Sequence, residues 1–118
     1  MAWAGLDQRV FPRVSTQCDL SIHTGLGGVL KTKTENLGAG GVCVILKQEL
    51  PKLSQVHVRI GLEPTGSPVE CEARVVWIVR SKELISGKIS FDTGLEFIQL
   101  PVKDQERITH FIQSRKRV

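Results

Sequence analysis

The sequence predicts a mainly β protein: a small antiparallel β-barrel of six or seven short strands with one C-terminal helix packed on it. Apolar and polar residues alternate over several short segments, and turn residues separate these segments. The apolar spacing changes to that of a helix only after Pro101. Strands followed by a single terminal helix are typical of such a barrel.

The first half of the chain supplies four of the expected strands. Apolar and polar residues alternate over 18–23, and residues 29–35 form the returning strand after a glycine-rich turn at 24–28. Residues 42–46 are continuously apolar, and alternation resumes over 56–63. All four segments are short enough to be joined by turns.

The second half predicts a long hairpin. Residues 69–80 and 89–97 both alternate, and the polar segment 81–87 lies between them as a turn. In the first of these strands, alternation puts Trp77 on the same face as Val75, which indicates the core.

The C-terminal segment 101–116 is expected to be the helix. Ile108, Phe111 and Ile112 have the spacing of one apolar helix face, and Asp104 suits the first turn. With 118 residues the chain is expected to be one domain. An N-terminal arm occupies residues 1–14, the barrel 15–100 and the helix 101–116.

A glycine-rich segment, residues 35–41, is expected to be a loop that leads into the strand at 42–46. Gly38, Gly40 and Gly41 would allow positive φ and a close backbone approach to a ligand. An ordinary turn between two strands is the alternative.

Two arginines, Arg9 and Arg13, flank Phe11 and Pro12 before the first expected strand. Pro12 disfavours helix, so the segment is expected to be extended or to turn. Arginine forks match phosphate and the edge of guanine, which would make the pair an anion clamp. Two solvated surface arginines are the alternative.

Composition narrows the function classes. The net charge of +4 favours anionic partners without choosing among them. Cys18, Cys43 and Cys71 are widely spaced, which favours buried thiols in a reducing, cytoplasmic compartment. No segment is apolar enough to span or insert into a membrane. The three histidines lack metal-ligand spacing and no catalytic motif is present, so we expect neither a metal nor an enzyme.

The arginine and glycine segments together resemble the PilZ domain. Its signature is Arg-x-x-x-Arg before the first strand, then Asp/Asn-x-Ser-x-x-Gly at the opening of a later one. This chain carries RVFPR at 9–13 and NLGAGG at 36–41. Segments 75–80 and 93–97 are also similar to the family, and the resemblance runs from about residue 8 to 114.

The resemblance implies a six-stranded antiparallel barrel that binds cyclic di-GMP, a bacterial second messenger, on its outer surface. It implies that Arg9 and Arg13 clamp the phosphates and guanine edges, and that Asn36 hydrogen-bonds the other guanine edges. Gly41 would allow close backbone approach. The expected protein is a bacterial receptor without a cofactor, and cyclic di-GMP is its ligand.

One position departs from the family pattern, because Gly38 stands where the motif has serine. A missing hydroxyl hydrogen bond costs about 0.5–1.5 kcal/mol. Charge-assisted arginine–phosphate bonds are stronger, so we expect binding to survive. Gln8, Gly40, Trp77 and Arg80 are further candidates for ligand contacts, and Gln8 in place of a third arginine favours a single bound molecule.

The expected mechanism is a ligand-gated switch, in which the arm folds over the glycine segment and changes the surface that an effector protein sees. A PilZ-like adaptor that has lost the nucleotide is the first alternative, and Gly38 supports it. A small nucleic-acid-binding barrel is the second, although aromatic residues for base stacking are missing from the outward faces of the strands.

Overall fold

Seven strands and one helix follow one another in the computed structural model, which describes residues 13–25, 27–63 and 66–116. All the strand pairs are antiparallel, which confirms the mainly β prediction with a C-terminal helix. The elements are β1 (Arg13–Ser15), β2 (Asp19–His23), β3 (Val29–Gly38), β4 (Gly41–Leu46), β5 (Gln55–Gly61), β6 (Val69–Lys82), β7 (Ile89–Ile98) and α2 (Val102–Lys116).

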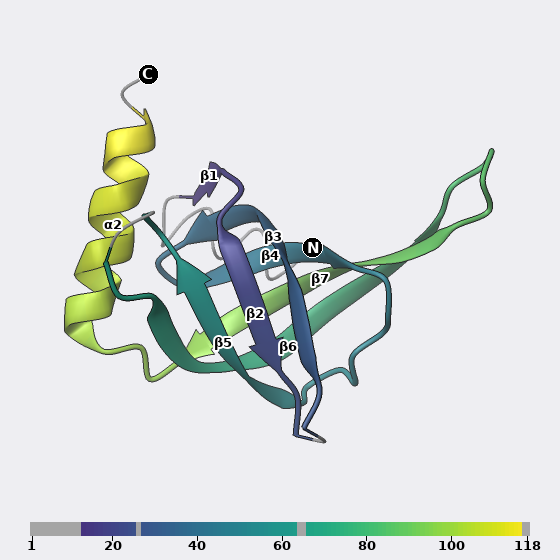
Figure 1. Cartoon of the computed structure of the whole chain (residues 1–118), viewed down its shortest axis with the longest axis horizontal. Coiled ribbons are helices and arrows are strands. Elements are labelled where there is room, and N and C mark those ends of the chain that lie inside the picture. Colours follow the sequence, from purple (N-terminus) through teal and green to yellow (C-terminus); the bar gives the residue numbers. More distant parts are fainter. Residues whose placement is uncertain (1–12, 26, 64–65, 117–118) are drawn as a thin grey trace.

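Six of these strands close into a barrel, as predicted. They follow the order β3-β2-β5-β6-β7-β4, and pairing between β4 and β3 closes the ring (Figure 1). β1 is an additional strand that pairs with the last residues of β3. The closing pair is short, because β4 meets β3 only between Thr34 and Leu37.

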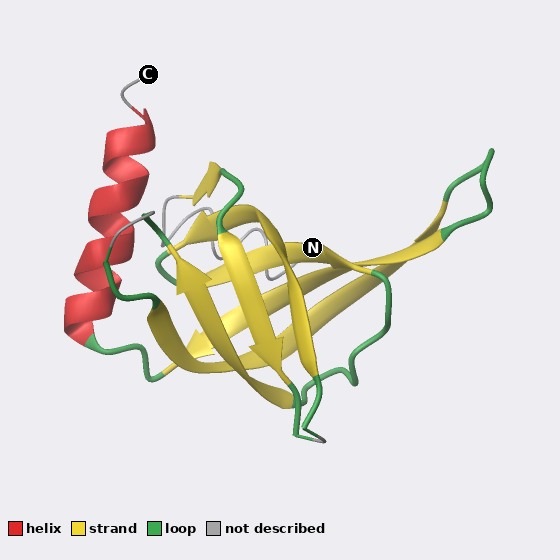
Figure 2. Ribbon diagram, viewed as in Figure 1, coloured by secondary structure: helices red, strands yellow, loops and turns green. Residues whose placement is uncertain are grey.

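The core fills the inside of the barrel and continues under the helix. Figure 2 shows α2 standing beside the barrel wall. Its apolar face is buried, and Ile108 is fully enclosed. Burial of these side chains is the main favourable term for folding. The largest fully buried side chains include Leu20, Ile22, Leu37, Val42, Val44, Val58, Ile60, Val75 and Leu95.

A buried threonine joins β1 to β2. Both strands pair with β3, and residues 16–18 connect them. The Thr34 hydroxyl accepts a hydrogen bond of 2.8 Å from the Cys18 amide and donates one of 2.6 Å to the Thr16 carbonyl. These bonds satisfy backbone groups at the break between the two strands. They therefore hold β1 in line with β2.

The glycine-rich segment is mostly strand, which corrects the expected loop. β3 runs on to Gly38, only Ala39 and Gly40 form the bend, and β4 begins at Gly41. The described glycines with positive φ are Gly27, Gly66 and Gly87. The expected positive φ at Gly38, Gly40 and Gly41 is therefore wrong: the bend between β3 and β4 forms without it.

The longest hairpin, β6–β7, contains a β-bulge near Trp77. Val75 pairs with Leu95 and Trp77 with Gly94, so Val76 is the extra residue. Such an insertion exchanges the two faces of the strand beyond it. Val75 is fully buried, whereas Trp77 is half-buried and lies outside the core. The prediction that Trp77 shares the face of Val75 is wrong for this reason.

Candidate functional site

One row of residues crosses the outer face of the barrel wall formed by β1, β3, β4, β7 and β6. Asn36 lies between Ser15 and Cys43, Cys43 is opposite Gly94, and Gly94 is opposite Trp77. Directly paired residues of antiparallel strands point to the same face. The flanking Val42 and Val44 belong to the core, so Cys43 and its row face outward.

The second row lies nearer the bend between β3 and β4. The backbone of Arg13 is opposite Gly38, Gly41 is opposite Glu96, and Glu96 is opposite Arg74. β1 thus brings the second arginine of the first motif directly beside the glycine segment. The predicted residues Arg13, Asn36, Gly38, Gly40 and Gly41 come together on this wall.

Local sequence explains why β1 ends up here. Arg13 and Val14, expected to belong to the arm, are part of β1, and Val14 packs against the core. One apolar anchor and the Thr34 hydrogen bonds hold this short strand. The arm expected at 1–14 falls mostly on residues 1–12, so Gln8 and Arg9 lie outside the described part of the chain.

Trp77 and Arg80 lie on opposite faces of β6. The bulge puts Trp77 on the outer face, in the row of Asn36, although two strands separate them. Arg80 is three residues farther along and therefore points to the other face, where it is exposed at the end of the barrel, opposite Phe91. The structure brings Trp77 to the candidate wall and does not bring Arg80 there.

The strand pattern gave no sign of three residues on this wall. Cys43 is 3% exposed, so the middle of the row is covered even though it faces outward. Gly94 is covered by the Trp77 indole. Asp92 pairs with Ile45, and its Oδ1 atom is buried without a hydrogen-bond partner among the described residues. Asp92 has an outward position in the alternation of residues 89–97, so the sequence gives no sign that one of its oxygen atoms is buried.

The opposite wall carries an ionic cluster. His57 Nδ1 lies 2.6 Å from Glu72 Oε2, and its Nε2 lies 3.1 Å from Glu70 Oε1. These hydrogen bonds, first to Glu72 and then to Glu70, raise the pKa of His57. They lower the pKa of both carboxyl groups. Among the described residues, no group of three or more His, Cys, Asp or Glu could hold a metal ion.

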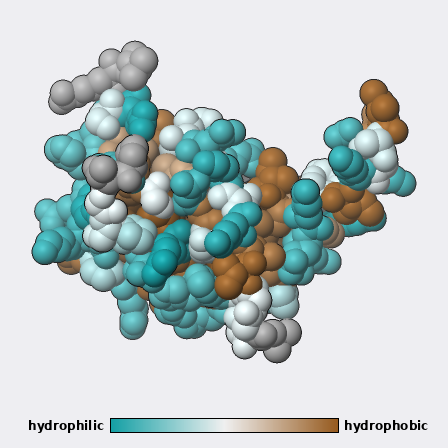
Figure 3. Space-filling view, in the orientation of Figure 1, coloured by the Kyte–Doolittle hydropathy of each residue, from teal (hydrophilic) through white to brown (hydrophobic). Residues whose placement is uncertain are grey.

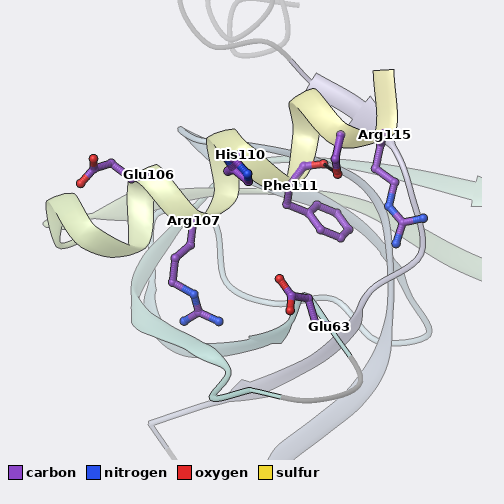
Figure 4. A pocket seen from close by; sticks show the side chains of 7 residues that line it. Glu63, Glu106, Arg107, His110, Phe111 and Arg115 are labelled. Carbon is purple, nitrogen blue, oxygen red and sulfur yellow. Dashed lines mark hydrogen bonds between the residues drawn. The ribbon is translucent and has the colours of Figure 1, made fainter. Parts of the chain in front are cut away.

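A cavity of about 580 Å³ lies away from both walls, between α2 and the end of β5 (Figure 4). Glu63 faces it from the segment after β5, and Arg107, Phe111 and Arg115 face it from the helix. Arg107 already donates to the Ser67 carbonyl and to Asp104. Arg115 lies over the Phe111 ring, 4.7 Å from its centroid. Because both arginines are engaged in contacts within the protein, we do not assign a function to this cavity.

Comparison with known families decides what this arrangement is. The model described as PilZ domain matches residues 7–114 of the chain. The chain belongs to the PilZ domain family. The match includes both the arginine segment and the glycine segment. No significant match to a curated protein was found.

Solved structures share the PilZ fold. The Bacillus subtilis inhibitor of motility MotI/DgrA has a TM-score of 0.76 and 23% identity, over 92% of this chain and 51% of its own. The PilZ domain of YcgR from Escherichia coli with c-di-GMP has a TM-score of 0.75 and 14% identity. The match covers 93% of this chain and 92% of that one. A longer YcgR structure from Escherichia coli in complex with c-di-GMP has a TM-score of 0.74 and 15% identity. The match covers 93% of this chain and 46% of that one. This chain thus spans about half the length of MotI/DgrA and of the longer YcgR.

Proposed function

We propose that the chain is a cyclic di-GMP receptor that binds the nucleotide on the outer wall around the bend between β3 and β4. The observation that carries the proposal is the pairing of Arg13 with Gly38, since it places the two halves of the PilZ signature side by side. Similar PilZ folds solved with c-di-GMP support it.

The chemistry of these residues suits a ligand with two phosphates and two guanines. Arg9 and Arg13 supply guanidinium groups that match phosphate oxygens and the O6/N7 edge of guanine. Asn36 offers both a donor and an acceptor, which complements the mixed donor and acceptor edge of guanine. Gly38 and Gly41 present backbone without side chains in the second row. We assign no catalytic role to any residue.

The receptor signals through an effector protein in this proposal. Ligand bound at Arg13 pulls residues 1–12 over the wall and changes the surface that the effector meets. Hydrogen exchange of the amides of residues 1–12, measured with and without cyclic di-GMP, tests this step. Slower exchange with ligand is expected, and equal rates would leave a receptor without the switch.

Calorimetric titration with cyclic di-GMP tests the binding itself. We expect micromolar or tighter binding by the native chain and a loss of at least about tenfold in Arg13→Ala. Arg59→Ala is the matched control, since it removes the same charge from β5 on the opposite wall. Absence of heat and of a thermal shift with the native chain would contradict the proposal and favour the adaptor without nucleotide.

A further inference from the structure

The β6–β7 hairpin extends well beyond the barrel. β4 pairs with β7 only as far as Phe91, whereas β6 and β7 continue to pair out to Lys82 and Ile89. Figure 1 shows this two-stranded extension leaving the barrel on the side away from α2. We call residues 81–90 the projecting hairpin.

Two large apolar side chains occupy its tip. Leu84 is 99% exposed and Ile85 is 98% exposed, so neither packs against another residue that the structure describes. Turn positions are ordinarily taken by small or polar residues. Figure 3 shows the apolar tip as a brown cap with hydrophilic surface behind it.

The tip is held by its own backbone. The Glu83 amide donates to the Lys88 carbonyl at 2.8 Å, and the Gly87 amide donates to the Glu83 carbonyl at 2.9 Å. Gly87 has a φ of 73°, which glycine adopts without strain. This closed turn presents Leu84 and Ile85 together.

Basic residues stand immediately behind the tip. Lys82 ends β6, Lys88 directly precedes β7, and Arg80 lies at the base of the extension. All three side chains are exposed, and Glu83 is the only acidic residue between Arg80 and Ile89. The projecting hairpin with Arg80 therefore carries an excess of positive charge behind an apolar end.

We propose that the projecting hairpin docks the protein on an anionic lipid bilayer. Leu84 and Ile85 enter the boundary between head groups and acyl chains, while Lys82 and Lys88 contact anionic head groups. The dimensions agree: Lys82 lies two residues from Leu84, about 7 Å along a strand. Interfacial segments bury their apolar side chains about 5–10 Å deep.

A bilayer suits this tip better than a protein surface does. A stable protein interface needs about 800 Å² from each partner. A narrow two-stranded extension that ends in two apolar residues offers far less on its own. Shallow lipid insertion needs only the tip and the charges behind it.

This contact is peripheral, and it differs from a membrane span. None of the helices in the described residues is long and apolar enough to cross a bilayer. The proposal departs at this one turn from the sequence-based expectation that no part inserts into a membrane. The inference is independent of the cyclic di-GMP site, because it uses no residue of that wall.

Vesicle co-sedimentation tests the proposal with the full chain and no nucleotide. Phosphatidylcholine vesicles with and without phosphatidylglycerol are the two probes. We expect the native protein to pellet with the anionic vesicles, and Leu84→Ser/Ile85→Ser to lose at least about tenfold in affinity. Val102→Ser, which removes an exposed apolar side chain at the start of α2, is the matched control and should bind normally.

A second pair of variants tests how much the two lysines contribute to vesicle binding. Lys82→Gln/Lys88→Gln should lose about fivefold per lysine on anionic vesicles only. Lys52→Gln/Lys103→Gln makes the same change in net charge at exposed sites elsewhere and should bind as the native chain does. Far-ultraviolet circular dichroism confirms that each variant is folded.

Three results would overturn the inference. The native protein could stay in the supernatant with anionic vesicles, or the control variants could lose as much binding as the hairpin variants. Sedimentation velocity without lipid gives the third: if the native chain is a dimer and Leu84→Ser/Ile85→Ser is a monomer, the tip is a contact between protein copies instead.

Discussion

The indole of Trp77 lies directly over Gly94, so close that a methyl group on Gly94 would come within 2.2 Å of the indole Nε1 atom. The bulge at Val76 creates this contact, because it turns Trp77 from the core to the outer face of the barrel. The contact also ties β6 to β7 at the edge of the candidate wall.

Gly94→Ala should therefore displace the indole. The rigid indole can make room for the new methyl group only by changing its rotamer. We therefore expect a loss of about 1–3 kcal/mol in the free energy of unfolding. Denaturant unfolding and tryptophan emission in a Trp3→Phe background measure both effects. Gly25→Ala is the control, since a methyl group there would meet nothing within 4 Å. Unchanged emission in Gly94→Ala would contradict the contact.

Thr34→Val should weaken the attachment of β1. The substitution leaves the buried Cys18 amide and Thr16 carbonyl without their partner, which costs about 1–3 kcal/mol. Thr32→Val on the same strand, where the side chain is only half-buried, should cost much less. Hydrogen exchange at residues 13–18 should accelerate in the first variant alone. Equal destabilisation by both variants would assign the loss to general packing of β3.

The His57 cluster should make stability depend weakly on pH. The raised pKa of His57 contributes stability that is complete below its ordinary value of 6.5 and is lost as pH rises through the folded value. The lowered pKa values of Glu70 and Glu72 contribute stability above 4.5 that is lost on acidification. The native chain should therefore exceed His57→Gln in free energy of unfolding most clearly between these two pH values. The difference should be small, because the cluster is exposed.

Unfolding curves of the native chain and His57→Gln at a series of pH values measure this difference. His23→Gln is a suitable control, because the His23 ring contacts His57 only by its edge. A difference in the free energy of unfolding that stays constant between about pH 5 and about pH 8, on the two sides of the ordinary histidine value, would rule out the ionic contribution.

The three thiols should be unreactive in the folded protein. Burial raises the pKa of Cys71 to about 11 and also raises that of Cys18. Cys43 is buried as well. Since the thiolate is the reactive form, thiol reagents near neutral pH should modify the chain only after denaturant is added. Rapid modification of one cysteine in the native state would reveal local opening at that strand.

Gly38→Ser restores the hydroxyl of the family motif and should strengthen cyclic di-GMP binding. One hydrogen bond corresponds to a gain of up to about tenfold in affinity. Calorimetry on this variant and on the native chain measures the difference in affinity. Gly25→Ser, in the turn between β2 and β3, is the control. Weaker binding would show that the backbone at Gly38 has no room for a side chain when ligand is bound.

The alternating strands, the hairpin and the C-terminal helix were predictable from the sequence because each depends on local spacing. The extension of β3 to Gly38 was not, since it depends on pairing with Arg13–Ser15, a segment too short to show alternation. The predicted face of Trp77 was wrong because of the bulge in β6. Residues 75–79 are all apolar, so a one-residue bulge does not change the apolar pattern there.

The candidate site divides in the same way. The two motifs were visible in the sequence, and β1 explains how they meet. Without the strand register, the sequence does not show that the Trp77 indole lies over Gly94. The roles of Arg9 and Gln8 stay predictions, as both precede the described residues.

The short closing pair of the barrel also constrains how the chain folds. β4 lies between β3, its neighbour along the chain, and β7, which comes from near the end of the chain and pairs Glu96 with Gly41. Contacts between distant parts of a chain form slowly, because a long loop must close first. On the ribosome, the six strands that precede β7 are therefore synthesised before β4 can gain its second neighbour. Until then the apolar β4 has one open edge, and this is the stage at which the nascent protein is most exposed to aggregation.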